Sequence, residues 1–389
     1  MAGLCRPYAA YALVKALREE VDVPIHFHTH DTSGISAASV LRAADAGADI
    51  VDLALASMSG ATSQPNLNSV VAALANTPRD TKLDLPSLNR LSQYWERVRS
   101  VYYPFEEGMK SGTAEVYHHE MPGGQYTNLR QQAKSLGLEE RWTEVADMYA
   151  KVNLLFGDIV KVTPSSKVVG DMALFMVTNH LTPEEVLEKG ATLNFPKSVV
   201  ELMQGHIGFP EGGWPKKVRK IILDSSKATA VTGRYGASLP RIDLTKTAAE
   251  LKEKLHREVT DLDVMSHLMY PQVFADFDKF HKMHDKVSVI PTHAFFYGLK
   301  VNEEINIEIE PGKGLVVRYL TTSDARDDGT RVVFFELNGQ PREVVVTDRS
   351  IGQTVHRAAK ADPDNAAHVG APMPGKVSMV TVTKGQTVK

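Results

Sequence analysis

The sequence predicts an α/β protein with parallel βαβ units first, a helical region next and a small antiparallel β unit after it. Three observations carry this prediction. From residue 7 to about 76, strand-like runs alternate with amphipathic segments of helical length, which is typical of βαβ units and a parallel sheet. Residues 86–220 are mostly helical in pattern. From residue 294 onward the apolar period changes from 3.6 residues to 2.

The first region alternates helix and strand. Pro7 suits the first turn of the opening helix, and Gly47 ends the second. The apolar run at the second strand, DIVDLAL, is typical of a strand buried in a sheet. We predict helices at Ala9–Glu20, Ile35–Ala46 and Leu67–Ala75, with strands at Val23–His28 and Asp49–Leu55.

The second region predicts a series of helices. Thr182 and Pro183 form a start signal, because a hydroxyl cap, a proline and two acidic residues follow one another. Two further helices are expected within residues 246–283, separated at Pro271. The other predicted helices are Leu88–Tyr103, Leu129–Leu136, Arg141–Leu155, Ser165–Asn179, Pro183–Lys189 and Lys197–Gln204.

The third region, residues 294–348, predicts antiparallel strands. Ile305, Ile307 and Ile309 alternate with polar residues, as in a half-buried strand. Asp-Asp-Gly at 327–329 and Asn-Gly at 338–339 supply the positive φ angles that hairpin turns need. Residues 350–368 lack a clear period and predict a linker.

Composition excludes several classes of protein. The 389 residues include 43% hydrophobic residues, too many for a disordered chain. Lys plus Arg number 44 and Asp plus Glu 47, giving a net charge of −3, which argues against a nucleic-acid partner. No apolar run is long enough to span a bilayer, so no membrane partner is expected. Cys5 is the single cysteine and cannot form an internal disulfide.

The segment from His26 to Gly34, HFHTHDTSG, is the strongest local signal for chemistry. Side chains two residues apart in a strand point the same way, so His26, His28 and His30 share one direction. Neutral imidazole is a common metal ligand, and α/β-barrel enzymes build their sites at this end of their strands. A divalent metal site is predicted, with a hydrogen-bonded histidine cluster as the alternative.

Several motifs in order resemble one family. The stretch HTHDTSG at 28–34 resembles the metal-binding strand of the carboxyltransferase domain of the pyruvate carboxylases. Further stretches that agree are SMSGATSQP at 57–65, PGGQYTNL at 122–129 and VTPSSKVVGD at 162–171. APMPGKV at 371–377 resembles the entry strand of a biotin carrier domain.

The resemblance implies the C-terminal part of a TIM (β/α)₈ barrel with a helical extension. It then implies a small antiparallel β unit and the first strands of a biotinyl carrier domain. The implied domains are 1–175, partial barrel; 176–245, helical extension; 246–348, tetramerisation segment; 349–369, linker; and 370–389, truncated carrier.

The resemblance also implies the metal ligands. In the family an Asp, a carboxylated Lys and two His hold the metal, and the two His match His28 and His30. The lysine would lie just ahead of Met1 and the aspartate further upstream, so the chain is expected to be a fragment that binds metal poorly and does not turn over alone. The implied cofactors are a divalent metal, Zn or Mn, and biotin, whose attachment lysine is absent from this chain.

The implied reaction transfers a carboxyl group from carboxybiotin to pyruvate and gives oxaloacetate, with ATP used in the whole enzyme. Thr163 matches the threonine that relays a proton, while Gln125, Ser166 and Lys167 match the biotin pocket. From the residues alone, Thr163 has the alternative of a helix cap before Pro164. The alternative for the other three is surface polarity, and Gly-Gly at 123–124 predicts a flexible turn.

The family further implies a homotetramer, located in the cytoplasm or, in a eukaryote, the mitochondrial matrix. The alternatives are the α chain of an oxaloacetate decarboxylase, a non-catalytic oligomerisation fragment, and a metal-dependent aldol-type barrel such as an acyl-transferring synthase.

Other residues are expected to be structural. We predict a solvated loop at His118 and His119, a helical-extension core from Trp95, Tyr102, Tyr103 and Phe105, and packing or a subunit contact from Tyr270, Phe274, Phe277 and Phe280.

Overall fold

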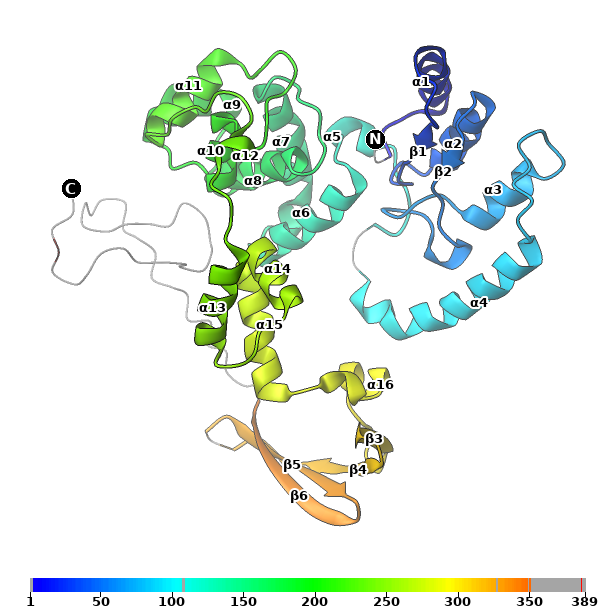
Figure 1. Cartoon of the computed structure of the whole chain (residues 1–389), viewed down its shortest axis with the longest axis vertical. Helices are drawn as coiled ribbons and strands as arrows, with labels where there is room; N and C mark the ends of the chain where they lie inside the picture. The colour runs from blue at the N-terminus through cyan, green and yellow to red at the C-terminus, as the bar shows by residue number, and fades with distance from the viewer. Residues whose placement is uncertain (1–2, 107–108, 327, 349, 351–385, 387–389) are drawn as a thin grey trace. The chain divides into compact units, whose positions relative to one another are not determined.

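The structure is a computed structural model that describes residues 3–106, 109–326, 328–348, 350 and 386. The chain divides into two compact units between Leu239 and Pro240 (Figure 1). The predictions of a linker at 349–369 and a carrier segment at 370–389 lie outside the described residues, apart from Ser350 and Gln386. No helix in the described part of the chain is long and apolar enough to cross a membrane.

The first unit begins with the predicted βαβ pattern. Strands β1 and β2 pair in parallel, with His26 opposite Ile50 and Phe27 opposite Val51. Each strand is shorter than expected, because only these residues form the paired ladder. The elements are α1 (Pro7–Glu20), β1 (His26–Phe27), α2 (Ser36–Asp45), β2 (Ile50–Val51) and α3 (Leu67–Leu74).

A compact core holds these elements together. Val14 of α1, Phe27 of β1, Val40 of α2 and Val70 of α3 are buried in one hydrophobic cluster. Each side chain of this size contributes about 1.5–3 kcal/mol when it is removed from water. The cluster fixes the end of β1, where the histidine segment begins.

Helix α4 (Leu85–Tyr102) begins earlier than predicted because Asp84 caps it, accepting a hydrogen bond from the Ser87 amide at 3.0 Å. The prediction that the aromatic residues of α4 and of the turn after it form a core is wrong. Trp95 is 40% exposed and Tyr103 63% exposed, and Ser92 is the one buried residue of the helix. The helical periodicity was correct, but periodicity does not say what covers the apolar face.

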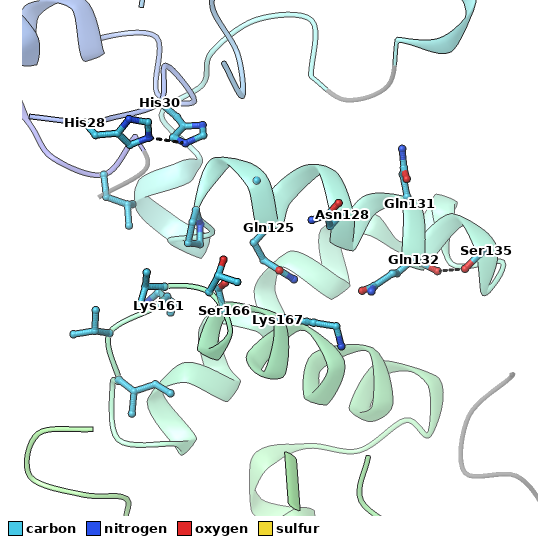
Figure 2. Close-up of a pocket in the computed structure, with 17 residues that line it drawn as sticks. His28, His30, Gln125, Asn128, Gln131, Gln132, Ser135, Lys161, Ser166 and Lys167 are labelled. Atoms are coloured by element: carbon cyan, nitrogen blue, oxygen red, sulfur yellow. Dashed lines mark hydrogen bonds between the residues drawn. The ribbon is translucent and has the colours of Figure 1, made fainter. Parts of the chain in front are cut away.

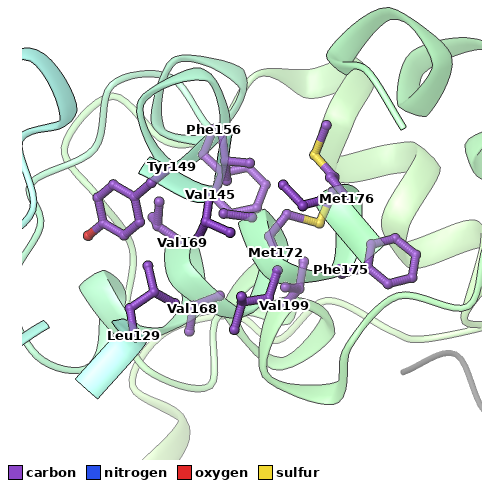
Figure 3. Packing of buried hydrophobic residues seen from close by; sticks show 14 of the residues in the cluster. Leu129, Val145, Tyr149, Phe156, Val168, Val169, Met172, Phe175, Met176 and Val199 are labelled. Atoms are coloured by element: carbon purple, nitrogen blue, oxygen red, sulfur yellow. The ribbon is translucent and has the colours of Figure 1, made fainter. Parts of the chain in front are cut away.

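The rest of the first unit is helical. A buried cluster extends from Met121 to Ile222, so the predicted boundary at residue 175 lies inside helix α8. Figure 3 shows Val169 and Met172 of α8 packed near Tyr149 and Phe156. The helices are α5 (Val116–His119), α6 (Gly123–Ser135), α7 (Trp142–Leu155), α8 (Ser165–Thr178), α9 (Pro183–Lys189), α10 (Lys197–Gln204), α11 (Lys216–Ser225) and α12 (Tyr235–Ser238).

Helix α6 differs most from its prediction. It begins at Gly123 rather than Leu129, so Gly123 and Gly124 form its first turn and are not a flexible turn. Pro122 is extended, with φ −60° and ψ 147°, and its carbonyl accepts from the Tyr126 amide at 2.9 Å. Glycine is a poor helix former, which hid the start of the helix from sequence reasoning.

The second unit has helices followed by a four-stranded antiparallel sheet of order β3-β4-β5-β6. Three helices, not two, occupy the region around 246–283, with the predicted break at Pro271. The β unit begins at Glu304 rather than Ala294, because residues 292–297 are helical. The elements are α13 (Leu244–Leu255), α14 (Asp261–Met269), α15 (Pro271–His284), α16 (Thr292–Tyr297), β3 (Glu304–Glu310), β4 (Lys313–Thr322), β5 (Thr330–Leu337) and β6 (Gln340–Thr347).

Candidate functional site

Two imidazoles face each other just beyond strand β1. The Nε2 atoms of His28 and His30 lie 3.3 Å apart, and the ring planes meet at 83° (Figure 2). His26 does not join them, since its Nε2 lies 2.8 Å from Asp52 Oδ1. The prediction that the three histidines share one direction is therefore met by His28 and His30, whereas His26 contacts the carboxylate of Asp52.

The other ring nitrogens of the pair are both occupied by acceptors. His30 Nδ1 lies 2.6 Å from the carbonyl oxygen of Thr62, and a carbonyl only accepts, so this nitrogen carries the proton. His28 Nδ1 lies 2.7 Å from Asp52 Oδ2. Hydrogen bonds from His26 and His28 lower the pKa of Asp52, so it is an accepting carboxylate. When both rings are neutral, each Nε2 atom keeps its lone pair, and the two atoms lie 3.3 Å apart.

This donor set fits a divalent cation. Two imidazole lone pairs cannot hydrogen-bond each other without a shared proton, whereas a cation between them satisfies both. Among the residues that the structure describes, no group of three or more His, Cys, Asp or Glu side chains could hold a metal. Within that part of the chain, His28 and His30 therefore offer two of the ligands that a catalytic metal needs.

The six predicted site residues all line one pocket. Its volume is about 1160 Å³, and its walls come from the histidine segment, α6, the loop at 159–163 and the first turn of α8 (Figure 2). The residues predicted for the metal site, the proton relay and the biotin pocket therefore lie in one pocket, although they come from segments far apart in the sequence. The predicted residues in its lining are His28, His30, Gln125, Thr163, Ser166 and Lys167.

Thr163 is not the cap of α8. The cap position is Pro164, which makes no side-chain cap bond, and Ser165 instead holds the loop. The Ser165 hydroxyl lies 2.8 Å from the carbonyl oxygen of Val160 and accepts from the Val162 amide at 3.1 Å. Thr163 is exposed at the pocket wall, with no hydrogen bond to its hydroxyl among the described residues. The helix-cap alternative is therefore wrong.

Gln125 presents an unused donor. Its side chain is 7% exposed, yet Nε2 has no hydrogen-bond partner within the described structure. A Cβ on Gly170 would lie 2.5 Å from that nitrogen, so the amide packs directly against α8 at this glycine. A buried donor without an acceptor costs about 1–3 kcal/mol, and an acceptor atom on a bound ligand would remove that cost.

Ser166 and Lys167 differ in exposure. Ser166 is buried, and its carbonyl accepts from the Tyr149 hydroxyl at 3.3 Å. Surface polarity is therefore the wrong explanation for Ser166. Lys167 is exposed and its ammonium lies 2.9 Å from Asp171 Oδ2, so its charge is held at the pocket edge.

Sequence reasoning missed three residues that shape the pocket or contact the histidine pair. Lys161 lines the pocket with a side chain only 6% exposed, and its ammonium lies 2.6 Å from Glu120 Oε2. A Cβ on Gly123 would lie 2.9 Å from His30 Nδ1, so the first turn of α6 packs against the ring. Asp52 had a usable signal, because it lies within the predicted strand Asp49–Leu55, the next strand of the βαβ pattern after the histidine strand.

His119 is buried on α5, not in a solvated loop. Its Nδ1 accepts from the Met121 amide at 3.0 Å. Loss of hydration, assisted by His118, lowers the pKa of His119 to about 4, so the ring is neutral at pH 7. His118 stays exposed and lies 3.0 Å from Asp147.

The fold and the histidine pair together define an α/β protein of the TIM-barrel-like class, with a candidate metal site beyond a parallel strand. The chain belongs to the conserved carboxylase domain family, which matches residues 116–318. Residues 1–94 match the HMGL-like family.

Pyruvate carboxylases are among its curated relatives. The chain is 50% identical to that of Bacillus subtilis over 388 residues, covering 100% of this chain and 34% of the relative. It is 46% identical to the mitochondrial pyruvate carboxylase of Homo sapiens over 392 residues, covering 100% of this chain and 33% of the relative. The chain thus spans about a third of the length of these relatives.

Solved structures agree with the sequence relatives. The carboxyl transferase domain of Rhizobium etli pyruvate carboxylase with pyruvate and biocytin superposes with a TM-score of 0.81 at 52% identity. That match covers 90% of this chain and 58% of the other. The complete multifunctional enzyme from the same organism gives a TM-score of 0.80 at 51% identity, covering 90% of this chain and 34% of that one. The barrel prediction is confirmed by this likeness.

Proposed function

We propose that the chain forms part of the site at which a pyruvate carboxylase moves a carboxyl group from carboxybiotin to pyruvate, and that it does not turn over alone. The observation that carries the proposal is the pocket that joins the histidine pair to Thr163, Gln125 and the start of α8. In the whole enzyme the carboxyl group would be supplied by an ATP-dependent step. The identity of the relatives favours this activity over the decarboxylase and aldol-type alternatives.

His28 and His30 would hold the divalent cation, Zn or Mn, through their Nε2 atoms. A bound cation at this position supplies Lewis-acid stabilisation of negative charge on a substrate oxygen. The acceptors on the Nδ1 atoms support this assignment, because they leave both Nε2 lone pairs available. The remaining ligands would come from outside the described residues, in line with the absence of a larger ligand group within them.

Thr163 would move the proton. The methyl group of pyruvate loses a proton, the N–C bond of carboxybiotin breaks, a C–C bond forms and the biotin nitrogen gains a proton. A hydroxyl donates and accepts, so Thr163 Oγ1 could pass this proton without ionising. Its exposure in the pocket and its freedom from capping support the role.

Gln125, Ser166 and Lys167 would bind the ureido and carboxylate groups. The unpaired Nε2 of Gln125 offers a buried donor to an acceptor oxygen. Lys167 offers positive charge at the pocket edge, moderated by Asp171. Biotin would reach the pocket on a carrier domain, whose entry strand the stretch APMPGKV at 371–377 resembles.

The test uses a chimera in which this chain replaces the matching third of the Bacillus subtilis enzyme. Thr163→Ala is expected to lower pyruvate carboxylation at least 100-fold, since proton transfer by a positioned group contributes about 10²–10⁴-fold. Thr163→Ser, which keeps the hydroxyl, is the matched control and should retain most activity. Oxaloacetate formation coupled to malate dehydrogenase measures both. Near-normal turnover by the alanine variant would exclude the relay role.

The assembly would be a homotetramer, formed in part through the segment 246–348. The exposed apolar side chains of α14 and α15 support this proposal. The compartment would be the cytoplasm in a bacterium or the mitochondrial matrix in a eukaryote, since the human relative is named as mitochondrial.

A further inference from the structure

We infer that Asp52 is a positioning residue that holds His28 in the tautomer and orientation in which its Nε2 lone pair faces His30. The inference deepens the proposed function, because it concerns the same candidate metal site. It rests on a set of contacts around one carboxylate. Asp52 Oδ2 lies 2.7 Å from His28 Nδ1, and Oδ1 lies 2.8 Å from His26 Nε2.

The parallel ladder places this carboxylate. Phe27 pairs with Val51, and the Asp52 amide donates to the Phe27 carbonyl at 3.2 Å. Asp52 and His28 are the next residues along the two paired strands, so the backbone brings their side chains together. The distance between them therefore depends on sheet register and not on a flexible loop.

The tautomer follows from what each acceptor allows. A carboxylate oxygen only accepts, so the proton of a neutral His28 ring lies on Nδ1, and Nε2 keeps its lone pair. Thr62 imposes the same tautomer on His30 through its backbone carbonyl. The Thr62 carbonyl belongs to the backbone, so no side-chain substitution removes it. The Asp52 carboxylate is a side chain, so a substitution at Asp52 tests how a hydrogen-bond acceptor fixes the tautomer of His28.

His26 orients the carboxylate. Its contact with Oδ1 leaves Oδ2 for His28, so the two oxygens have separate partners. This explains why a third histidine lies beside the pair without pointing at it. His26→Ala should loosen the carboxylate yet leave the acceptor in place, and so have a smaller effect than Asp52→Ala.

The test records ¹⁵N spectra of the full chain with labelled histidine, free of metal and at a pH where the rings are neutral. In the unsubstituted chain, His28 should show a protonated Nδ1 and an unprotonated Nε2. Asp52→Ala should give a mixture of tautomers at His28 and leave His30 unchanged. Asp147→Ala is the matched control, since it removes a carboxylate 3.0 Å from the exposed His118. An unchanged His28 tautomer in Asp52→Ala would overturn the inference.

A second measurement titrates the same proteins with Zn²⁺. Loss of such a partner typically weakens metal binding 10–100-fold, and we expect that range for Asp52→Ala and no change for Asp147→Ala. Equal weakening by both variants would also overturn the inference. The tautomer is measured without any bound metal, so it does not depend on the proposed carboxyltransferase function. If that function were wrong and the inference right, the chimera would be inactive while His28 kept the expected tautomer. Circular dichroism would check that each variant is folded.

Discussion

At the scale of single residues, hydration and hydrogen-bond partners decide which groups are available for chemistry. His118 and His119 are adjacent, yet one is exposed beside Asp147 and the other is 4% exposed. The buried ring accepts from a backbone amide through Nδ1, and Nε2 is left without a partner within the described residues. The same contrast separates the buried Ser166 from the exposed Lys167.

The first prediction concerns the pH dependence that His119 imposes on stability. Burial lowers its pKa from 6.5 to about 4, so between these values the unfolded chain binds the extra proton. Stability from this group is complete above pH 6.5 and is lost as the pH falls toward 4, by about 3 kcal/mol in total. Urea unfolding of the chain at pH 5 and pH 7 measures the part of this change that falls between those two values, about 2 kcal/mol.

Two asparagine variants isolate the contribution. His119→Asn keeps an acceptor for the Met121 amide but cannot titrate, so the difference between pH 5 and pH 7 should shrink. His118→Asn, at the exposed neighbour, should leave the difference nearly as it was. A pH dependence that is the same in all three proteins would contradict the assignment.

At the scale of elements, α6 and α8 form the two helical walls of the pocket. Both have glycine at a close contact: Gly123 lies against the His30 ring, and Gly170 lies against the Gln125 amide. Such helices gain most of their stability from tertiary packing, which offsets the low helix propensity of glycine at these positions. The low helix propensity of glycine explains why the start of α6 at Gly123 was not evident from the sequence pattern.

The second prediction compares neighbouring glycines at the start of α6. Gly123→Ala places a Cβ 2.9 Å from His30 Nδ1, and such overpacking should cost about 1–3 kcal/mol. At Gly124 a Cβ meets nothing within 4 Å, so Gly124→Ala should stabilise the chain by up to about 1 kcal/mol. Urea unfolding gives both values, and destabilisation of equal size by the two variants would contradict the contact.

The third prediction concerns the capping box of α9. Thr182 Oγ1 accepts from the Glu185 amide at 3.3 Å, and Glu185 Oε2 accepts from the Thr182 amide at 3.0 Å. Thr182→Ala should therefore lower the free energy of unfolding by about 0.5–2 kcal/mol. Thr182→Ser keeps the cap and should cost less. Thermal unfolding followed by circular dichroism compares them.

At the scale of the whole molecule, helices α14 and α15 of the second unit carry several exposed apolar side chains within the described residues. Phe274 is buried as predicted, but Tyr270, Phe277 and Phe280 are exposed, so the packing prediction is correct for Phe274 alone within the unit. Met269 and Val273 add to the exposed set. Large apolar surfaces of this kind mark interaction sites, which is consistent with the proposed contact between subunits.

The fourth prediction tests that contact. Phe277 is 63% exposed, so Phe277→Glu should leave the fold intact while adding a charge to the proposed interface. In the chimera, sedimentation velocity should show a smaller assembly than the tetramer. Gln272→Glu adds the same charge at another exposed position of α15 and should leave the assembly unchanged. An unaltered tetramer in Phe277→Glu would exclude this face.

The sequence by itself determined the features that depend on local periodicity and on short motifs. The βαβ order, most helices, the antiparallel strands and the histidine pair could be found this way, whereas Gln125, Thr163, Ser166 and Lys167 were singled out by the family resemblance alone. These features were accessible because side-chain spacing and turn residues act over a few positions.

Only the tertiary structure decided how those residues are presented. The tautomers of the histidine pair depend on Asp52 and Thr62, which lie 24 and 32 positions away in the chain. The unpaired amide of Gln125 and the buried ring of His119 likewise depend on packing around them. The exposure of the α4 aromatics could not be predicted either, because a helix pattern identifies an apolar face but not the surface that covers it. Protonation and burial are set by long-range contacts, which no local pattern encodes.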